Sequence, residues 1–169
     1  MKNLRARRLG ALIAAFSAIS IAAAACESDP TLALPREGAP RQLGFVIGGF
    51  GTDFRQVELR KDTVVFRHVA WSDGAVDSVR AVPTAEQWRG FWASVDEIGV
   101  DQWRRRYVNP RVVDGLGWQL LLQTEEREIV STGSNSYPGP RGRENEEEMT
   151  PEFLAFLDTL GDLVGVEIL

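Results

Sequence analysis

The sequence predicts an α+β domain in which an antiparallel sheet, made of a β-meander and a second hairpin, is covered on one face by two helices. Two observations lead to this prediction. Apolar and polar residues alternate through residues 43–82, whereas after Pro83 and again after Thr150 the apolar residues recur at helical spacing. The predicted order is β-β-β-β-α-β-β-α, and strands that follow one another directly favour antiparallel pairing over a parallel sheet.

Four short strands are predicted first, at residues 43–49, 54–61, 62–71 and 75–82. They are rich in Val and Phe, which favour strands. The connections carry turn residues: a GFGTD stretch follows the first strand, Lys61-Asp62 suits a tight turn, and Ser72-Asp73-Gly74 precedes the fourth strand. We therefore expect consecutive strands to pair with one another.

The first helix is predicted to begin after Pro83 and to end at Gly99. Thr84 and Gln87 have the spacing of a capping box, in which each side chain accepts a hydrogen bond from the backbone N–H of the other residue. The apolar residues that follow share one helical face: Trp88, Phe91, Trp92, Val95 and Ile98. This face must be buried, and the sheet is the obvious partner.

A second hairpin is predicted from residues 117–123 and 127–132, joined by a polar turn at Thr124-Glu125-Glu126. A loop rich in Gly, Ser, Pro and Glu follows at 133–149. Thr150 then caps a final helix that has Pro151 at its first position. The apolar face of this helix consists of Phe153, Phe156, Leu157 and Leu160.

The chain begins with the features of a secretory signal peptide. Residues 1–8 are basic and contain no acid, and residues 9–25 are uncharged and end in small residues. As a transmembrane helix, this uncharged run would span roughly 25 Å, which is short of the ~30 Å hydrocarbon core of a bilayer. We therefore expect cleavage in preference to a retained anchor.

The end of this leader resembles the lipobox of bacterial lipoproteins, in which small residues precede an invariant cysteine. The matching residues are Ala23, Ala24, Ala25 and Cys26, with Ala23 at a position where Leu or Val is usual. The resemblance implies cleavage before Cys26 and attachment of lipid, such as palmitate, to that residue. It also implies a protein of the cell membrane or outer membrane whose domain faces the extracytoplasmic side. Because Cys26 is the only cysteine, an internal disulfide is excluded.

We therefore expect a signal peptide at 1–25, an acylated cysteine with a Pro-rich tether at 26–42, and a single domain at 43–169. Residues 26–169 hold 15 basic and 24 acidic residues, a net charge of −9. Nucleic acid requires a basic surface, so this balance excludes it as a partner. The same balance disfavours electrostatic attraction to anionic lipid, so the membrane contact is expected through the lipid on Cys26.

No cofactor or metal site is predicted. The single histidine, His68, lies within a predicted strand, and no G-x-S-x-G motif for a nucleophile occurs. The glycines within residues 48–51 fit neither a dinucleotide-binding nor a Walker pattern and are typical of a turn. The acidic run at 144–149 lacks the ligand spacing of an EF-hand loop. We interpret it as a solvated entry to the last helix, with weak calcium binding left open.

The candidate binding surface combines residues 103–118 with residues 133–141. Aromatic and charged side chains in these segments are suited to contact a carboxylate, a glycan or a partner protein. The candidates are Trp103, Arg105, Tyr107, Asp114, Trp118, Asn135 and Tyr137. The two segments resemble uncharacterised bacterial domains in which Asp-Gly-x-x-Trp, here at 114–118, is followed by Gly-Ser-Asn-x-x-Pro, here at 133–138. This resemblance implies no activity, and turn chemistry with a core tryptophan also explains the pattern.

Three functions fit these features. We favour a lipid-anchored binding or envelope-maintenance module without catalysis, whose partner is an envelope protein or glycan. The alternative is a hydrolase of envelope carbohydrate, whose two carboxylates, roughly 5–10 Å apart, would come from Asp101, Asp114, Glu125 and Glu126. The third is a small-molecule carrier with a pocket under the first helix, a space that we expect Trp88, Phe91 and Trp92 to fill.

Overall fold

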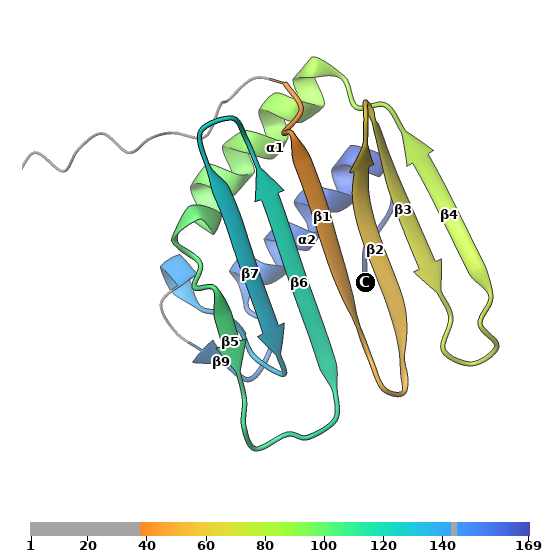
Figure 1. The fold of residues 1–169 in the computed structure, drawn as a ribbon, viewed down its shortest axis with the longest axis vertical. Helices are drawn as coiled ribbons and strands as arrows, with labels where there is room; N and C mark the ends of the chain where they lie inside the picture. The colour runs from red at the N-terminus through yellow and green to blue at the C-terminus, as the bar shows by residue number, and fades with distance from the viewer. Residues whose placement is uncertain (1–37, 143–144) are drawn as a thin grey trace, which may run out of the picture. The chain divides into compact units, whose positions relative to one another are not determined.

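The computed structural model describes residues 38–142 and 145–169. They form a seven-stranded, mostly antiparallel sheet with two helices on one face (Figure 1). The predicted α+β class is therefore confirmed. The predicted signal peptide, Cys26 and the tether up to residue 37 lie outside the described residues. Neither helix in the described part of the chain is long and apolar enough to cross a membrane.

The predicted β-meander is present. Its strands are β1 (Gln42–Gly49), β2 (Thr52–Arg60), β3 (Thr63–Val69) and β4 (Val76–Ala81), and each pairs antiparallel with the next. The turns lie where the sequence places them. Lys61, with φ 62°, and Gly74, with φ 70°, adopt the left-handed conformation that tight turns require.

The second hairpin, β6 (Leu116–Gln123) and β7 (Glu128–Ser134), extends the same sheet because β6 pairs antiparallel with β1. A further strand, β5 (Arg106–Val108), pairs parallel with β7 and completes the order β4-β3-β2-β1-β6-β7-β5. The sequence analysis does not predict β5, because three residues after a run of arginines show no alternation. This parallel pair is the exception to the antiparallel arrangement.

The segment predicted as a loop at 133–149 is partly ordered into short elements, so that prediction is wrong in detail. It contains the end of β7, the two-stranded pair β8 (Tyr137–Pro138) and β9 (Asn145–Glu146), and the 3₁₀ helix η2 (Pro140–Gly142). Another 3₁₀ helix, η1 (Val100–Gln102), follows the first α-helix. Elements of two or three residues are too short to give a periodic signal.

Both predicted helices are present with their predicted caps. In α1 (Ala85–Ile98), the Thr84 side chain accepts from Gln87 N and the Gln87 side chain accepts from Thr84 N, and Gly99 ends the helix in the left-handed conformation. In α2 (Pro151–Val164), Thr150 Oγ1 accepts a hydrogen bond from Phe153 N.

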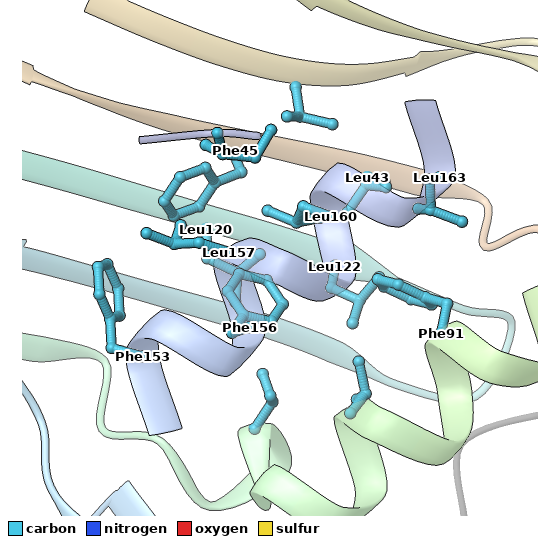
Figure 2. Packing of buried hydrophobic residues seen from close by; sticks show 14 of the residues in the cluster. Leu43, Phe45, Phe91, Leu120, Leu122, Phe153, Phe156, Leu157, Leu160 and Leu163 are labelled. Carbon is cyan, nitrogen blue, oxygen red and sulfur yellow. The ribbon is translucent and has the colours of Figure 1, made fainter. Parts of the chain in front are cut away.

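The hydrophobic core lies between the helices and one face of the sheet, and β1 is at its centre. The inward side chains of β1, Leu43, Phe45 and Ile47, are buried, whereas the residues between them are half-buried on the other face. Figure 2 shows Phe45 close to Phe153 and Phe156 of α2, and their ring centroids lie 6.2 and 5.8 Å from that of Phe45. The inward face of the central strand is thus covered by α2.

The space under α1 is filled by its own aromatic side chains. Trp88, Phe91 and Trp92 are buried, and the Phe91 ring makes edge contacts with both tryptophans, at centroid distances of 5.6 and 5.0 Å. A small-molecule carrier would need a cavity at this place. The packing therefore gives no support to that hypothesis.

Candidate functional site

Four of the seven residues predicted to form a binding surface are core residues. Trp103, Tyr107, Trp118 and Tyr137 are each at most 7 % exposed. The rings of Trp103, Trp118 and Tyr137 pack around Phe153 of α2, at centroid distances of 6.0, 5.0 and 4.9 Å, and Tyr107 packs on Trp118. The prediction of an aromatic surface is therefore wrong, because these side chains point to the helix side of the sheet.

The remaining three predicted residues do not form a shared site. Arg105 and Asp114 are exposed, and Asn135 is half-buried. Arg105 contributes its carbonyl oxygen, which accepts from the hydroxyl of Thr132 at 3.2 Å. Asp114 lies in the loop before β6. The side chain of Asn135 instead occupies the space where a Cβ of the neighbouring Gly115 would lie.

The segments 114–118 and 133–138, which carry the two motifs, pack closely against each other at two glycines. A Cβ at Gly115 would lie 2.0 Å from Oδ1 of Asn135, and one at Gly133 would lie 1.9 Å from Nε1 of Trp118. The indole of Trp118 occupies the space left at Gly133 and donates from Nε1 to Ser136 O at 2.9 Å. Both motifs therefore have a structural explanation, which is close packing between β6, β7 and the chain after β7.

Tyr107 holds the segment before β5 against the 3₁₀ helix η2. Its hydroxyl donates to Gly142 O at 2.6 Å and accepts from Arg104 N at 2.8 Å. Burial raises the pKa of the Tyr107 phenol above its ordinary value, so the hydroxyl stays protonated at neutral pH and keeps its donor role. Tyr107 thus has a structural role.

Of the acids proposed for carbohydrate hydrolysis, Asp114 lies far from Glu125, and both Glu125 and Asp101 are paired with arginines. Asp114 precedes β6 and Glu125 follows it, so a strand of about 26 Å separates them. Glu125 lies 2.9 Å from Nη2 of Arg41, and Asp101 lies 3.4 Å from Nη1 of Arg127. Glu126 is exposed in the turn. Among residues 38–142 and 145–169, no three His, Cys, Asp or Glu side chains are grouped to hold a metal ion.

A different set of acids lines a groove of about 470 Å³ between α1 and α2: Glu97, Glu152, Asp158 and Asp162. Three of them are exposed and Glu152 is half-buried. A general acid in a glycosidase is kept protonated by an apolar pocket, which solvated helix side chains do not provide. The groove therefore offers carboxylates without the environment that the hydrolase reaction requires.

His68 belongs to a polar cluster that the sequence analysis misses. Its Nε2 lies 2.8 Å from Oδ2 of Asp53, whose other oxygen accepts from Trp71 N at 3.0 Å, and Arg55 lies 3.5 Å from the same carboxylate. The hydrogen bond from Trp71 N and the contact with His68 lower the pKa of Asp53 below its ordinary value. The cluster depends on the β2–β3 register, which pairs Arg55 with His68. The predicted two-residue turn at Lys61-Asp62 fixes that register, so the pairing follows from the sequence once the turn is placed.

Within residues 38–142 and 145–169, no helix covers the face of the sheet that points away from α1 and α2, which we call the open face. Val46 of β1 lies at its centre, opposite Gln56 of β2 and Gln119 of β6. Gln119 in turn lies opposite Thr132 of β7. Two arginines continue the row, since Arg67 is opposite Gln56 and Arg106 is opposite Thr132, and Ser78 of β4 lies beyond Arg67. Hydrogen-bonding side chains thus cross the sheet from β3 to β5.

A shallow depression of about 380 Å³ lies in the open face beside this row. Its polar lining comes from Gln56, Gln119 and Thr132, and its apolar lining includes Val46, Leu121 and Val130. Gly44 contributes no side chain to the middle of it. The depression therefore combines amide and hydroxyl groups with an apolar floor, the usual composition of a ligand-binding surface.

Gly44 has no structural reason to be glycine. A Cβ at this position would have no heavy atom within 4 Å, and the residue has no positive φ. In contrast, a Cβ at Gly48 on the same strand would meet Phe54 at 3.0 Å. Glycine weakens the interior of a strand and often marks a place where another molecule approaches the backbone. Gly44 is therefore the best single indication of a binding site.

The comparisons with known proteins add no family assignment: no family model matches the chain, and no curated protein has a similar sequence.

Gly133→Ala is expected to lower the free energy of unfolding by about 1–3 kcal/mol, since the new methyl group would displace the buried indole of Trp118. Denaturant unfolding measures this change. Gly117→Ala is the matched control on the neighbouring strand, because the nearest atoms lie at an ordinary 3.7 Å. Its effect should stay within about 0.5 kcal/mol. Equal effects of the two substitutions would contradict the close packing at Gly133.

Asp53→Asn is expected to make the free energy of unfolding less dependent on pH at acidic pH. The folded-state pKa of Asp53 is lowered, so its carboxylate stabilises the fold above the ordinary pKa of 3.8, and this stabilisation disappears as the pH falls through the folded-state value. Denaturant unfolding from about pH 6 downwards measures the slope. Asp158→Asn, an exposed change on α2, should leave the slope as in the wild type. A variant of Asp53 with the wild-type slope would refute its role.

Proposed function

We propose that this protein is a lipid-anchored, extracytoplasmic binding module without catalytic activity. Its attachment is assigned to Cys26 because the leader and the residues before this cysteine resemble those of bacterial lipoproteins. Its partner is an envelope protein or glycan, bound on the open face of the sheet.

The observation that carries the binding role is the depression at Gly44. A glycine in a central strand costs stability, and no residue among those described fills the space above it. The amides of Gln56 and Gln119 each supply a donor and an acceptor, and the hydroxyl of Thr132 supplies both as well. Such groups orient a polar partner, while Leu121 and Val130 provide apolar contact.

The two arginines of the polar row indicate which chemical groups the partner carries. Arg67 and Arg106 lie on the two sides of the amides, whereas Glu58, opposite Gly44, is paired with Arg60 at 2.9 Å. Guanidinium groups bind carboxylates and phosphates in a bidentate manner. A partner that carries acidic groups on a hydrogen-bonding backbone or on sugar rings fits this surface best. The carbohydrate-hydrolase alternative gains no support, because Asp114 lies a strand length from Glu125, and Glu125 and Asp101 are paired with arginines.

The intact mass of the protein from host-cell membranes tests the anchor. We expect a chain that begins at Cys26 and carries added acyl mass, and accumulation of the full precursor when the lipoprotein signal peptidase is inhibited. Cys26→Ser should accumulate as precursor, whereas the nearby control Ser28→Ala should be processed. A chain that keeps Met1, or one that begins at residue 26 without acyl mass, would contradict lipidation.

Photo-crosslinking in host membranes tests the open face. A photoreactive residue in place of Gln119 should give a discrete adduct, and Gly44→Val should suppress it by filling the depression with a side chain that suits a strand. A photoreactive residue in place of Arg89, exposed on α1, is the control and should give none. Equal labelling at both positions, or an adduct that Gly44→Val leaves unchanged, would refute the proposed surface.

A further inference from the structure

Exposed apolar side chains are concentrated at one end of the sheet. Ten large apolar residues of the described chain are exposed, and six of them lie in or beside the turns after β1, β3 and β5. We call these six the apolar edge: Phe50, Phe54, Trp71, Val76, Val112 and Val113. A clustering of this kind marks an interaction surface, whereas scattered exposed apolar residues need no explanation.

The strand directions bring the three turns together. β1, β3 and β5 run the same way, since β3 is two antiparallel pairings from β1, and β5 is parallel to β7. The turns that follow them therefore share one end of the sheet, as Figure 1 shows. Two of the turns touch, because Gly49 packs against the backbone of Gly115 at the end of the β5–β6 loop.

The aromatic pair at this end is held in place. Phe50 and Trp71 are 74 % and 54 % exposed, and their rings meet edge to face at a centroid distance of 5.1 Å. The turn of Trp71 is fixed by Asp53, whose carboxylate accepts from Trp71 N at 3.0 Å. The pair is thus presented to solvent by a preorganised turn, which limits the conformational entropy lost on binding.

The chemistry of the apolar edge fits a lipid interface. Tryptophan favours the boundary between lipid headgroups and acyl chains, where its ring is buried and its N–H stays hydrated, and phenylalanine adds apolar surface that inserts below the headgroups. Four of the six side chains stand on the connections between strands, and Val113 there is 94 % exposed. Lipids rearrange around such protruding groups. The turns carry Asp73, Arg111 and Asp114, so they offer no excess of positive charge for anionic lipid.

The tether is long enough to let this end reach the bilayer. The described chain starts on the helix layer at the opposite end of β1, where the indole of Trp92 donates to Gly38 O at 2.9 Å. β1 spans about 26 Å. Residues 26–37 reach up to about 37 Å in an extended polyproline conformation. The tether therefore spans the length of the sheet.

We propose that the apolar edge docks into the interface of the bilayer to which the chain is attached, with Phe50, Trp71 and Val113 inserted among neutral lipids. This inference rests on the proposed membrane attachment. In the docked state the open face stands roughly upright on the membrane and is free for its partner.

Fluorescence of Trp71 tests the docking, because the other four tryptophans are buried. The full chain from host membranes is reconstituted into phosphatidylcholine vesicles, with or without bromine atoms on the acyl chains, which quench nearby tryptophan. We expect brominated lipid to quench a component of the emission that Trp71→Phe removes. The addition of anionic phosphatidylglycerol should not increase the quenching.

Substitutions distinguish docking from mere proximity to the membrane. Phe50→Ser should lower the ratio of docked to free domain about tenfold, the effect of losing one buried aromatic side chain. Val82→Ser is the matched control, since Val82 is also exposed but follows β4 at the other end of the sheet. It should leave the quenching unchanged.

Unchanged Trp71 emission in brominated vesicles, with full access for aqueous acrylamide, would overturn the proposal. Protection of Trp71 from acrylamide in native membranes but not in phosphatidylcholine vesicles would also overturn it, in favour of a protein partner. The intact mass reports separately on the anchor. Docking without acyl mass would refute lipidation and leave the apolar edge as the membrane contact.

Discussion

The contact between the inner side of β1 and α2 is the one on which the rest of the structure depends. β1 pairs with β2 of the meander and with β6 of the second hairpin, so it alone joins the two parts of the described sheet. Its buried Phe45 meets Phe153 and Phe156 of α2. A sheet with one apolar face is stable only when that face is covered, so this contact holds both halves of the sheet in one domain.

Helices on one face leave the other face of the sheet in water, and this asymmetry creates the surfaces to which we assign function. The open face carries the depression at Gly44, and one end of the sheet carries the apolar edge. The two surfaces are distinct, so a bilayer and a soluble partner do not compete for the same residues. The N-terminal end of the described chain is fixed elsewhere, by the hydrogen bond from the indole of Trp92 to Gly38 O.

The misassigned aromatic surface shows where reasoning from local sequence fails. Trp103 and Tyr107 flank three arginines, and this mixture is typical of exposed binding segments. Their burial depends on β5, a three-residue strand that pairs parallel with β7 and places Tyr107 opposite Gly133, 26 positions later in the chain. Gly44 is the opposite case. Nothing in the neighbouring sequence marks it as special, and only the structure shows that a Cβ at this position would have no heavy atom within 4 Å.

The sequence by itself determined the class of fold, the four strands of the meander, both helices and the residues that cap them. These features depend on alternation, helical spacing and hydrogen bonds such as that between Thr84 and Gln87, three positions apart, so each can be read within a short window. Only the tertiary structure decided the place of β6 beside β1, the position of β5, the open face and the meeting of three turns in the apolar edge. Pairing and burial of this kind join residues far apart in the chain, and their free energy belongs to the packed domain as a whole.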